Sequence, residues 1–215
     1  MRLCSALSGG QIAFIIIVPI VVLVGLFLLI YIPIRNKKMK QNFKYFYYRY
    51  IYKIALDNDY YLINDFRFKI DERHIAIIDH ILFANKYIYI ISDNYFEGDI
   101  DGKESDPSII FINRTGKKVY TDNIILNNTR LIKKLSVITG IGQSLMIGIN
   151  LVNNNCNCAI KTTTKNAYII QANKFKNLVK AIESRPIGDI NKEQLDAAVK
   201  AVNKLNRRKK QNAKK

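Results

Sequence analysis

The sequence predicts an α/β domain that follows an N-terminal transmembrane helix, with a sheet flanked by helices and a further helix near the C-terminus. Three observations predict this class. Residues 12–34 are apolar and uncharged, short β-branched runs recur over residues 60–171, and apolar residues at helical spacing occupy 123–139 and 175–205. Strand-like runs separated by an amphipathic helix are typical of α/β domains.

Residues 12–34 form an uninterrupted stretch without a charged or strongly polar side chain. A helix of this length crosses about 30 Å of hydrocarbon at about 1.5 Å per residue. A cleaved signal peptide is the rival interpretation, but the stretch exceeds a usual signal core, only Arg2 precedes it and no small-residue cleavage motif follows it. We therefore expect an uncleaved single-pass anchor.

Basic residues flank the predicted span unevenly. Arg2 alone lies before it, whereas five cations follow it closely, at Arg35, Lys37, Lys38, Lys40 and Lys44. Because cytoplasmic flanks are enriched in Lys and Arg, this bias predicts that residues 1–11 lie outside the cytoplasm. The rest of the chain after residue 34 is then cytoplasmic, at the cell membrane.

The whole chain is strongly basic, with 34 Lys and Arg against 17 Asp and Glu, a net charge of +17. Such a charge favours a polyanionic neighbour, either nucleic acid or an anionic membrane surface, and does not choose between them. Cysteine usage bears on the compartment. The three cysteines, Cys4, Cys156 and Cys158, are too few and too clustered for a disulfide framework, which agrees with a reduced domain.

Residues 35–57 interleave cations, including Arg49, with tyrosines and are predicted to form a basic aromatic helix beside the membrane. On nucleic acid, the cations would meet phosphates and the rings would stack on bases. At a bilayer, the rings would lie at headgroup depth and the cations on anionic lipid. Because the segment follows the anchor directly, we favour the lipid interpretation.

The central part of the chain is expected to hold the strands. Ala84, Asn85 and Lys86 separate two apolar runs at a length suited to a hairpin, and residues 99–107 are expected to be a polar loop. The strand-like runs are 60–68, 75–83, 87–91, 109–112, 118–120, 145–152, 156–161 and 168–171.

Three helices are predicted after the central hairpin. The first covers 123–139, with Asp122 or Asn123 as its cap and Gly140 as its stop, and the second ends before Pro186. The third is amphipathic and covers 189–206. A tail over 207–215 follows, whose cations are expected to be solvated with weak affinity for phosphate-bearing partners: Arg207, Arg208, Lys209, Lys210, Lys214 and Lys215.

Carboxylates interrupt both runs of the central hairpin, at Asp79 and Asp93. A buried carboxylate needs a partner, so each is a metal ligand, a hydrogen-bonded structural group or an exposed strand end. The frame around them, Ile78-Asp79-His80 followed by a strand that leads to Gly98, resembles the nuclease-related domain (NERD) family of the PD-(D/E)XK nuclease-like group. This resemblance implies a restriction-endonuclease-like mixed sheet flanked by helices over residues 58–184, with similarity from about residue 41.

The resemblance also implies a site where two carboxylates hold Mg²⁺ and a lysine activates water. Asp79 matches one ligand, but the family's Glu falls on Ser92, its Lys on Asn94, and a further helix ligand near Arg49. Asp93 could substitute only if a bulge turned it to the same face of the sheet. We therefore expect a catalytically inactive domain without a cofactor, whose basic surface contacts the bilayer and binds nucleic acid or a protein partner.

Two alternatives stay open. One is an active membrane-tethered nuclease with a relocated ligand set that holds Mg²⁺ at Asp79, and the other is a scaffolding protein without a nucleic-acid role. His80 is expected to be structural because no nucleophile with an orienting pair is visible. Cys156 and Cys158 are expected to be ordinary thiols, since no second pair completes a zinc site.

Overall fold

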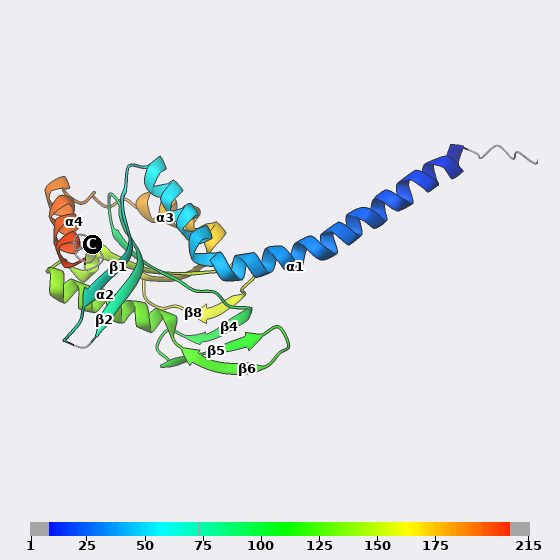
Figure 1. The fold of residues 1–215 in the computed structure, drawn as a ribbon. Coiled ribbons are helices and arrows are strands. Elements are labelled where there is room, and N and C mark those ends of the chain that lie inside the picture. Colours follow the sequence, from blue (N-terminus) through cyan, green and yellow to red (C-terminus); the bar gives the residue numbers. More distant parts are fainter. Residues whose placement is uncertain (1–8, 73, 207–215) are drawn as a thin grey trace, which may run out of the picture. The chain divides into compact units, whose positions relative to one another are not determined.

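The computed structural model describes residues 9–72 and 74–206 of the 215-residue chain (Figure 1). The chain divides into two units, one up to Phe43 and one from Lys44 onward, and each is described by itself. Residues 1–11 were predicted to be an extracytoplasmic terminus, and residues 1–8 lie outside the described part. So does the predicted basic tail, residues 207–215.

Helix α1, Gly9–Asp57, contains the predicted span. Within it, Ile17–Arg35 is long and apolar enough to cross a membrane, and among the described helices it alone has this property. Its length, composition and place near the N-terminus fit a single membrane span or a signal sequence. The backbone of α1 leaves helical geometry at Asn42 (φ −122°, ψ 22°), so α1 consists of two helical parts.

The second part of α1 packs into the domain core, whereas the sequence predicts a domain that begins at residue 58. Tyr47, Ile51, Ile54 and Ala55 are all buried. Their spacing of three or four residues places them on one face of the helix. The helix therefore contributes a full apolar stripe to the core, and the basic aromatic composition of the segment concealed it.

The main sheet has five strands in the order β1-β2-β3-β7-β9. Strands β1, β2 and β3 are antiparallel, and β7 and β9 continue the sheet in parallel to β3. The mixed sheet and the central hairpin of β2 and β3 are confirmed. The bounds are Tyr61–Lys69 for β1, Ile75–Phe83 for β2, Ile88–Asp93 for β3, Met146–Val152 for β7 and Ala167–Gln171 for β9.

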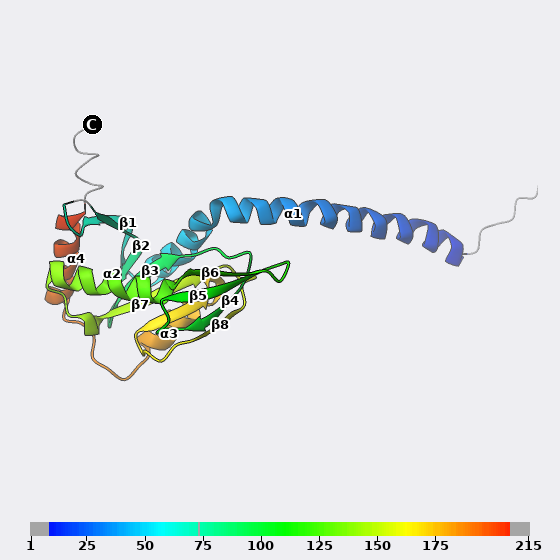
Figure 2. The same ribbon diagram turned by 90° about the horizontal axis from the view of Figure 1, so that it is seen from below.

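A second sheet has four strands in the order β6-β5-β4-β8 (Figure 2). Strands β5 and β6 are the predicted second hairpin, and β8 pairs with β4 in parallel. The bounds are Gly98–Lys103 for β4, Ser108–Asn113 for β5, Lys118–Asp122 for β6 and Cys158–Lys161 for β8.

Strand β4 shows that the predicted polar loop over residues 99–107 is wrong in its first part. Ile100 is fully buried, while Asp99 and Asp101 on either side of it are exposed. Because two acidic residues flank the one buried residue, the composition of this strand is polar and predicts a loop. Gly98 fits this strand because a Cβ there would lie 2.0 Å from the carbonyl oxygen of Ile112.

Three helices follow the hairpins, as predicted. Helix α2, Ile124–Thr139, ends at Gly140 with φ 74°, and α3 spans Phe175–Glu183. Helix α4, Lys192–Leu205, begins after Asn191, whose side chain accepts a hydrogen bond from the Glu193 N–H. Two short 3₁₀ turns, Gln143–Leu145 and Ala172–Lys174, precede β7 and α3.

Asn123 is the cap of α2, which resolves the two predicted candidates. Its Oδ1 accepts from the N–H groups of Ile125 and Leu126, while its Nδ2 contacts the carbonyl oxygens of Lys103, Glu104 and Asp106 at 2.7–3.1 Å. The side chain is buried. Asn123 therefore joins the start of α2 to the turn after β4.

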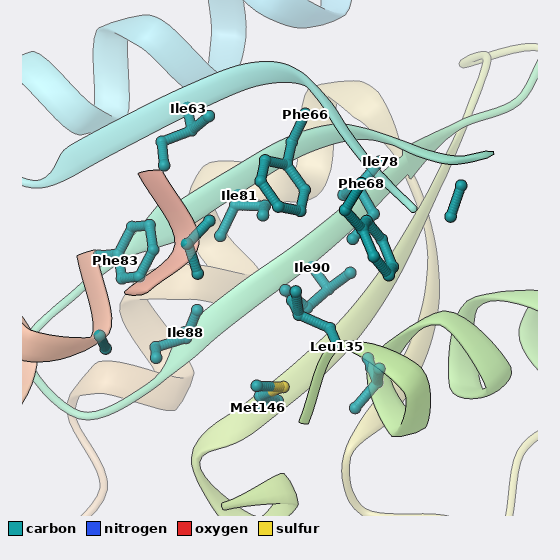
Figure 3. Close-up of a cluster of buried hydrophobic side chains, with 14 residues drawn as sticks. Ile63, Phe66, Phe68, Ile78, Ile81, Phe83, Ile88, Ile90, Leu135 and Met146 are labelled. Atoms are coloured by element: carbon teal, nitrogen blue, oxygen red, sulfur yellow. The ribbon is translucent and has the colours of Figure 1, made fainter. Parts of the chain in front are cut away.

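The core lies on both faces of the main sheet. One face packs against α2 and α4 through the side chains in Figure 3, among them Phe66, Phe68, Ile81 and Leu135. The other face carries the end of α1 and α3, as the contacts of Tyr48 with His80 and of Glu183 with Tyr89 show. A smaller cluster around Ile100, Ile109, Val152 and Cys156 lies against the second sheet.

The contacts of Asn123 predict that aspartate is a poor replacement at this cap, although aspartate and asparagine are usually equivalent there. Asn123→Asp keeps the side-chain oxygen that accepts hydrogen bonds at the start of α2. It replaces the buried Nδ2 donor with an anionic oxygen that faces three carbonyl oxygens. We expect the free energy of unfolding to fall by about 2–4 kcal/mol, measured by urea unfolding of the full chain in detergent micelles.

Asn191→Asp is the matched control for this substitution. The side chain of Asn191 is exposed and accepts one hydrogen bond at the start of α4, a contact that aspartate retains. We expect a change within about 0.5 kcal/mol. Equal losses in the two variants would contradict the assigned role of the Asn123 amide.

Candidate functional site

The candidate site lies where β1 and β2 change the face that they turn toward the core. A regular strand keeps residues of one parity on one face. Here the residues that face the core change from odd to even numbers along β1, between Ile63 and Phe66. At the same level of β2, they change from even to odd numbers, between Ile78 and Ile81. Asp65, at φ 48°, stands at the switch in β1, and the unbroken register on either side places it opposite Asp79. The switch therefore turns polar side chains of both strands toward α1.

Asp79 sits at this switch with both carboxylate oxygens engaged. Lys44 Nζ, from α1, lies 2.6 Å from Oδ1, and the backbone N–H of Asp93, on β3, donates to Oδ2 at 2.9 Å. Burial lowers the pKa of Lys44, but the hydrogen bond and the negative charge of Asp79 outweigh it, so this pKa is raised. One carboxylate thus links α1, β2 and β3.

His80, the next residue, is buried and has an oxygen at each ring nitrogen. Nδ1 lies 2.7 Å from Oδ1 of Asn64, and Nε2 lies 2.9 Å from Oδ2 of Asp93. The ring thus bridges Asn64 of β1 and Asp93 of β3, and its contact with Asp93 is buried on both sides. Tyr48 of α1 stacks on the ring at 6.4 Å.

Asp93 faces His80 with a fully buried side chain, and its second oxygen, Oδ1, has no hydrogen-bond partner. Burial raises the pKa of Asp93, and the hydrogen bond and positive charge of His80 act in the opposite direction. The carboxylate is therefore committed to His80, while only the backbone of Asp93 contacts Asp79. These contacts give the two hairpin carboxylates separate roles.

The residues at the family's other charged positions make neutral contacts. Ser92, half-buried on β3, accepts from the Asn94 side chain through its carbonyl oxygen at 3.2 Å. The carbonyl oxygen of Asn94 accepts from the Tyr47 hydroxyl at 3.2 Å. Arg49 is exposed on α1. Burial raises the pKa of Tyr47, so this hydroxyl stays protonated as a donor.

The contact of Lys44 with Asp79 was not predicted, because the sequence indicates lipid or nucleic acid as the partner of this lysine. Lys44 precedes Tyr48 by four residues, one helical turn, so both side chains lie on the helix face that is turned toward the sheet. That spacing was the available signal. Of the other predicted contact residues, four are exposed on α1 before residue 44: Arg35, Lys37, Lys38 and Lys40. Those of the tail lie outside the described residues: Arg207, Arg208, Lys209 and Lys210.

The donor set around Asp79 does not fit a Mg²⁺ site. Mg²⁺ requires oxygen ligands with enough negative charge, and here an ammonium group already lies on the one available carboxylate. Asp93 turns its carboxylate to His80, and Ser92 and Asn94 are uncharged. Throughout residues 9–72 and 74–206, no group of three or more His, Cys, Asp or Glu side chains could hold a metal ion.

The two cysteines in the described part lie near β8, away from these contacts. Cys156 is buried, and burial raises the pKa of its thiol to about 12. Burial also raises the pKa of Cys158. Both thiols stay protonated at neutral pH, which suits packing and does not suit nucleophilic chemistry. Cys4 lies outside the described residues.

Comparison with known families gives one result that bears on this arrangement. The family model of the nuclease-related domain (NERD) matches residues 44–160, more than half of the chain. The chain belongs to the NERD family. The matched segment of the NERD domain begins at Lys44, where the second structural unit also begins. Neither the curated proteins nor the solved structures contain a significant match.

The buried pair predicts a specific dependence of stability on pH. A carboxyl group whose folded pKa is raised binds more protons in the folded state, so its contribution to stability falls as the pH rises above the unfolded value of about 3.9. Asp93→Asn removes this titration and keeps an oxygen that accepts from His80. We expect the stability of the wild type relative to Asp93→Asn to fall as the pH rises from about pH 4.

Thermal or urea unfolding of both full-length proteins in the same micelles measures this difference. Asp71→Asn is the control, because Asp71 is an exposed carboxylate beside the exposed His74. A wild type that gains stability relative to Asp93→Asn as the pH rises would contradict the buried pair as described.

Proposed function

We propose that this chain is a membrane-anchored NERD domain that binds a partner surface and does not cleave nucleic acid. The observation that supports this most directly is the 2.6 Å contact of the Lys44 ammonium with the Asp79 carboxylate. Metal-dependent cleavage needs a divalent cation to stabilise charge on the attacked phosphate. At Asp79, the Lys44 ammonium group, which carries a single positive charge, lies next to the carboxylate where a divalent cation would bind.

Electrostatics favour the lysine over a metal ion. Asp79 and Lys44 together carry no net charge, so the pair provides little attraction for an ion of charge +2. The backbone N–H of Asp93 occupies the second carboxylate oxygen. A metal would have to displace both groups without gaining a second carboxylate.

A relocated ligand set is the rival, and it needs the Asp93 carboxylate to turn toward Asp79. That rotation would break the buried contact between Asp93 and Nε2 of His80. Leaving a buried polar group without its hydrogen-bond partner costs about 1–3 kcal/mol. The inactive domain is therefore the better supported of the two proposals.

We further propose that Ile17–Arg35 remains as a single membrane span, with the N-terminus outside and the NERD domain in the cytoplasm. The four cations of residues 35–43 follow the span, against Arg2 before it. Such an excess is the usual mark of a cytoplasmic flank. No acidic residue lies between Met1 and Leu56 to offset it.

The distribution of charge supports an anionic bilayer as the main polyanionic neighbour. Residues 44–206 hold 23 of the 34 Lys and Arg and all 17 Asp and Glu, which leaves +6 on the domain. The remaining 11 cations lie in residues 1–43 and 207–215, two segments whose sequence contains no Asp or Glu. Juxtamembrane cations of this kind attract anionic lipid.

The test is a cleavage assay on the full chain reconstituted in nanodiscs. Single-stranded and double-stranded DNA and RNA are incubated with Mg²⁺ or Mn²⁺, and the products are resolved by electrophoresis. We expect no cleavage above that of empty nanodiscs, because Asp79 lacks a second carboxylate partner.

Asp79→Ala is the matched control variant for this assay. Cleavage by the wild type that Asp79→Ala abolishes would overturn the inactive domain and favour the relocated-ligand nuclease. The same samples report nucleic-acid binding, which we expect to be lost between about 50 mM and about 200 mM salt. Binding that persists at the higher concentration would point to a nucleic-acid function.

A further inference from the structure

The helical segment from Lys44 to Asp57 has two apolar faces, which is unusual for a helix on the surface of a domain. Its inner face, with Tyr47 and Ile51, is buried in the core. Its outer face carries Tyr45, Tyr52 and Leu56, which are 59%, 48% and 69% exposed. A surface helix normally has one apolar stripe and a polar opposite side. The outer face is therefore a candidate contact surface.

These outer residues form a continuous line together with two cations. Positions 45, 49, 52, 53 and 56 are spaced by three or four residues, so they follow one side of the helix over about 17 Å at about 1.5 Å per residue. Arg49 and Lys53 are exposed within this line. We name this set the outer stripe: Tyr45, Arg49, Tyr52, Lys53 and Leu56.

Chain connectivity limits how far the outer stripe can lie from the apolar span. Tyr45 follows Arg35, the end of Ile17–Arg35, by ten residues, which reach at most about 36 Å even when fully extended. The neighbouring Lys44 is fixed to Asp79 of the sheet. If the span crosses a bilayer, the Tyr45 end of the outer stripe stays within that distance of the headgroup layer.

We propose that the outer stripe is a second contact with the bilayer, which lays the NERD domain on the membrane surface. The tyrosine rings and Leu56 enter the boundary between headgroups and acyl chains, and Arg49 and Lys53 meet lipid phosphates. This proposal rests on the membrane anchoring proposed above.

The chemistry of the outer stripe suits a lipid surface. Tyrosine has an apolar ring and a polar tip, and it is enriched where a protein passes from hydrocarbon to water. Leu56 adds an aliphatic side chain, which gives no stacking surface for a base. Arg49 and Lys53 have no acidic neighbour within the stripe, so the face as a whole attracts anionic headgroups.

The contact would also cover the degenerate site. On the inner side of the same helix, Lys44 holds Asp79 and Tyr48 stacks on His80. The helix would then lie between the bilayer and these residues. A nucleic-acid strand could not approach Asp79 from that side.

The absence of tryptophan from the chain allows a direct test with single-tryptophan variants. Tyr52→Trp reports on the outer stripe, Phe27→Trp on the apolar span, and Tyr120→Trp, at a side chain 77% exposed on β6, on a surface away from the stripe. Each full-length variant is reconstituted in nanodiscs with and without brominated lipids. Loss of tryptophan fluorescence then measures contact with acyl chains.

We expect brominated lipid to quench Phe27→Trp and Tyr52→Trp by about twofold or more and to leave Tyr120→Trp unchanged, because Trp replaces Tyr readily at the membrane interface. If Phe27→Trp is quenched and Tyr52→Trp is not, the second contact is wrong and the anchoring stands. If Phe27→Trp is not quenched, the anchoring is wrong and the second contact with it. If only single-stranded RNA changes the emission of Tyr52→Trp, the stripe belongs to nucleic acid.

A second measurement tests the two cations of the outer stripe. In nanodiscs with anionic lipid, Arg49→Ser with Lys53→Ser should reduce the quenching of Tyr52→Trp to the value found in zwitterionic lipid. Lys165→Ser with Lys200→Ser removes the same charge from exposed positions elsewhere on the domain and should leave the quenching unchanged. Equal effects of the two pairs would overturn the role of Arg49 and Lys53.

Discussion

The contact between Lys44 and Asp79 is the constraint on which the arrangement of the NERD domain depends. It joins α1 to the level of the sheet where β1 and β2 change faces, and the second oxygen of Asp79 joins β3 through the Asp93 backbone. With these elements fixed, His80 reaches Asp93 and Tyr48 covers the imidazole. A nuclease-like frame is thus joined by the Lys44 ammonium group and by the buried contact between His80 and Asp93.

The same contacts explain how a NERD domain can keep its fold without the family's charged positions. Ser92 and Asn94 stand where the family has an anion and a cation. The carbonyl oxygen of Ser92 accepts a hydrogen bond from the Asn94 side chain, and the carbonyl oxygen of Asn94 accepts one from the Tyr47 hydroxyl. Asp79 and His80 remain because each satisfies a partner across the sheet. The presence of Asp79 and His80 in the frame is therefore explained by these structural contacts, and the frame alone does not establish cleavage.

Local signals in the sequence predict much of the fold, and contacts between distant segments do not. The β2–β3 hairpin and α2 with its stop at Gly140 follow from short patterns. Strand β4 was missed because its acidic residues alternate with one buried isoleucine. The face switch depends on the backbone of Asp65, and the Lys44–Asp79 pair spans 35 positions, so neither follows from composition or periodicity.

The most direct test of the central claim is a Mn²⁺ titration of the full chain in nanodiscs, followed by electron paramagnetic resonance. Mn²⁺ prefers oxygen ligands as Mg²⁺ does, and the signal of the free ion is lost when the protein binds it. We predict that the chain removes no more free Mn²⁺ than the Asp79→Ala variant does. Stoichiometric binding that disappears in Asp79→Ala would show that a metal ion displaces Lys44, and it would contradict the account.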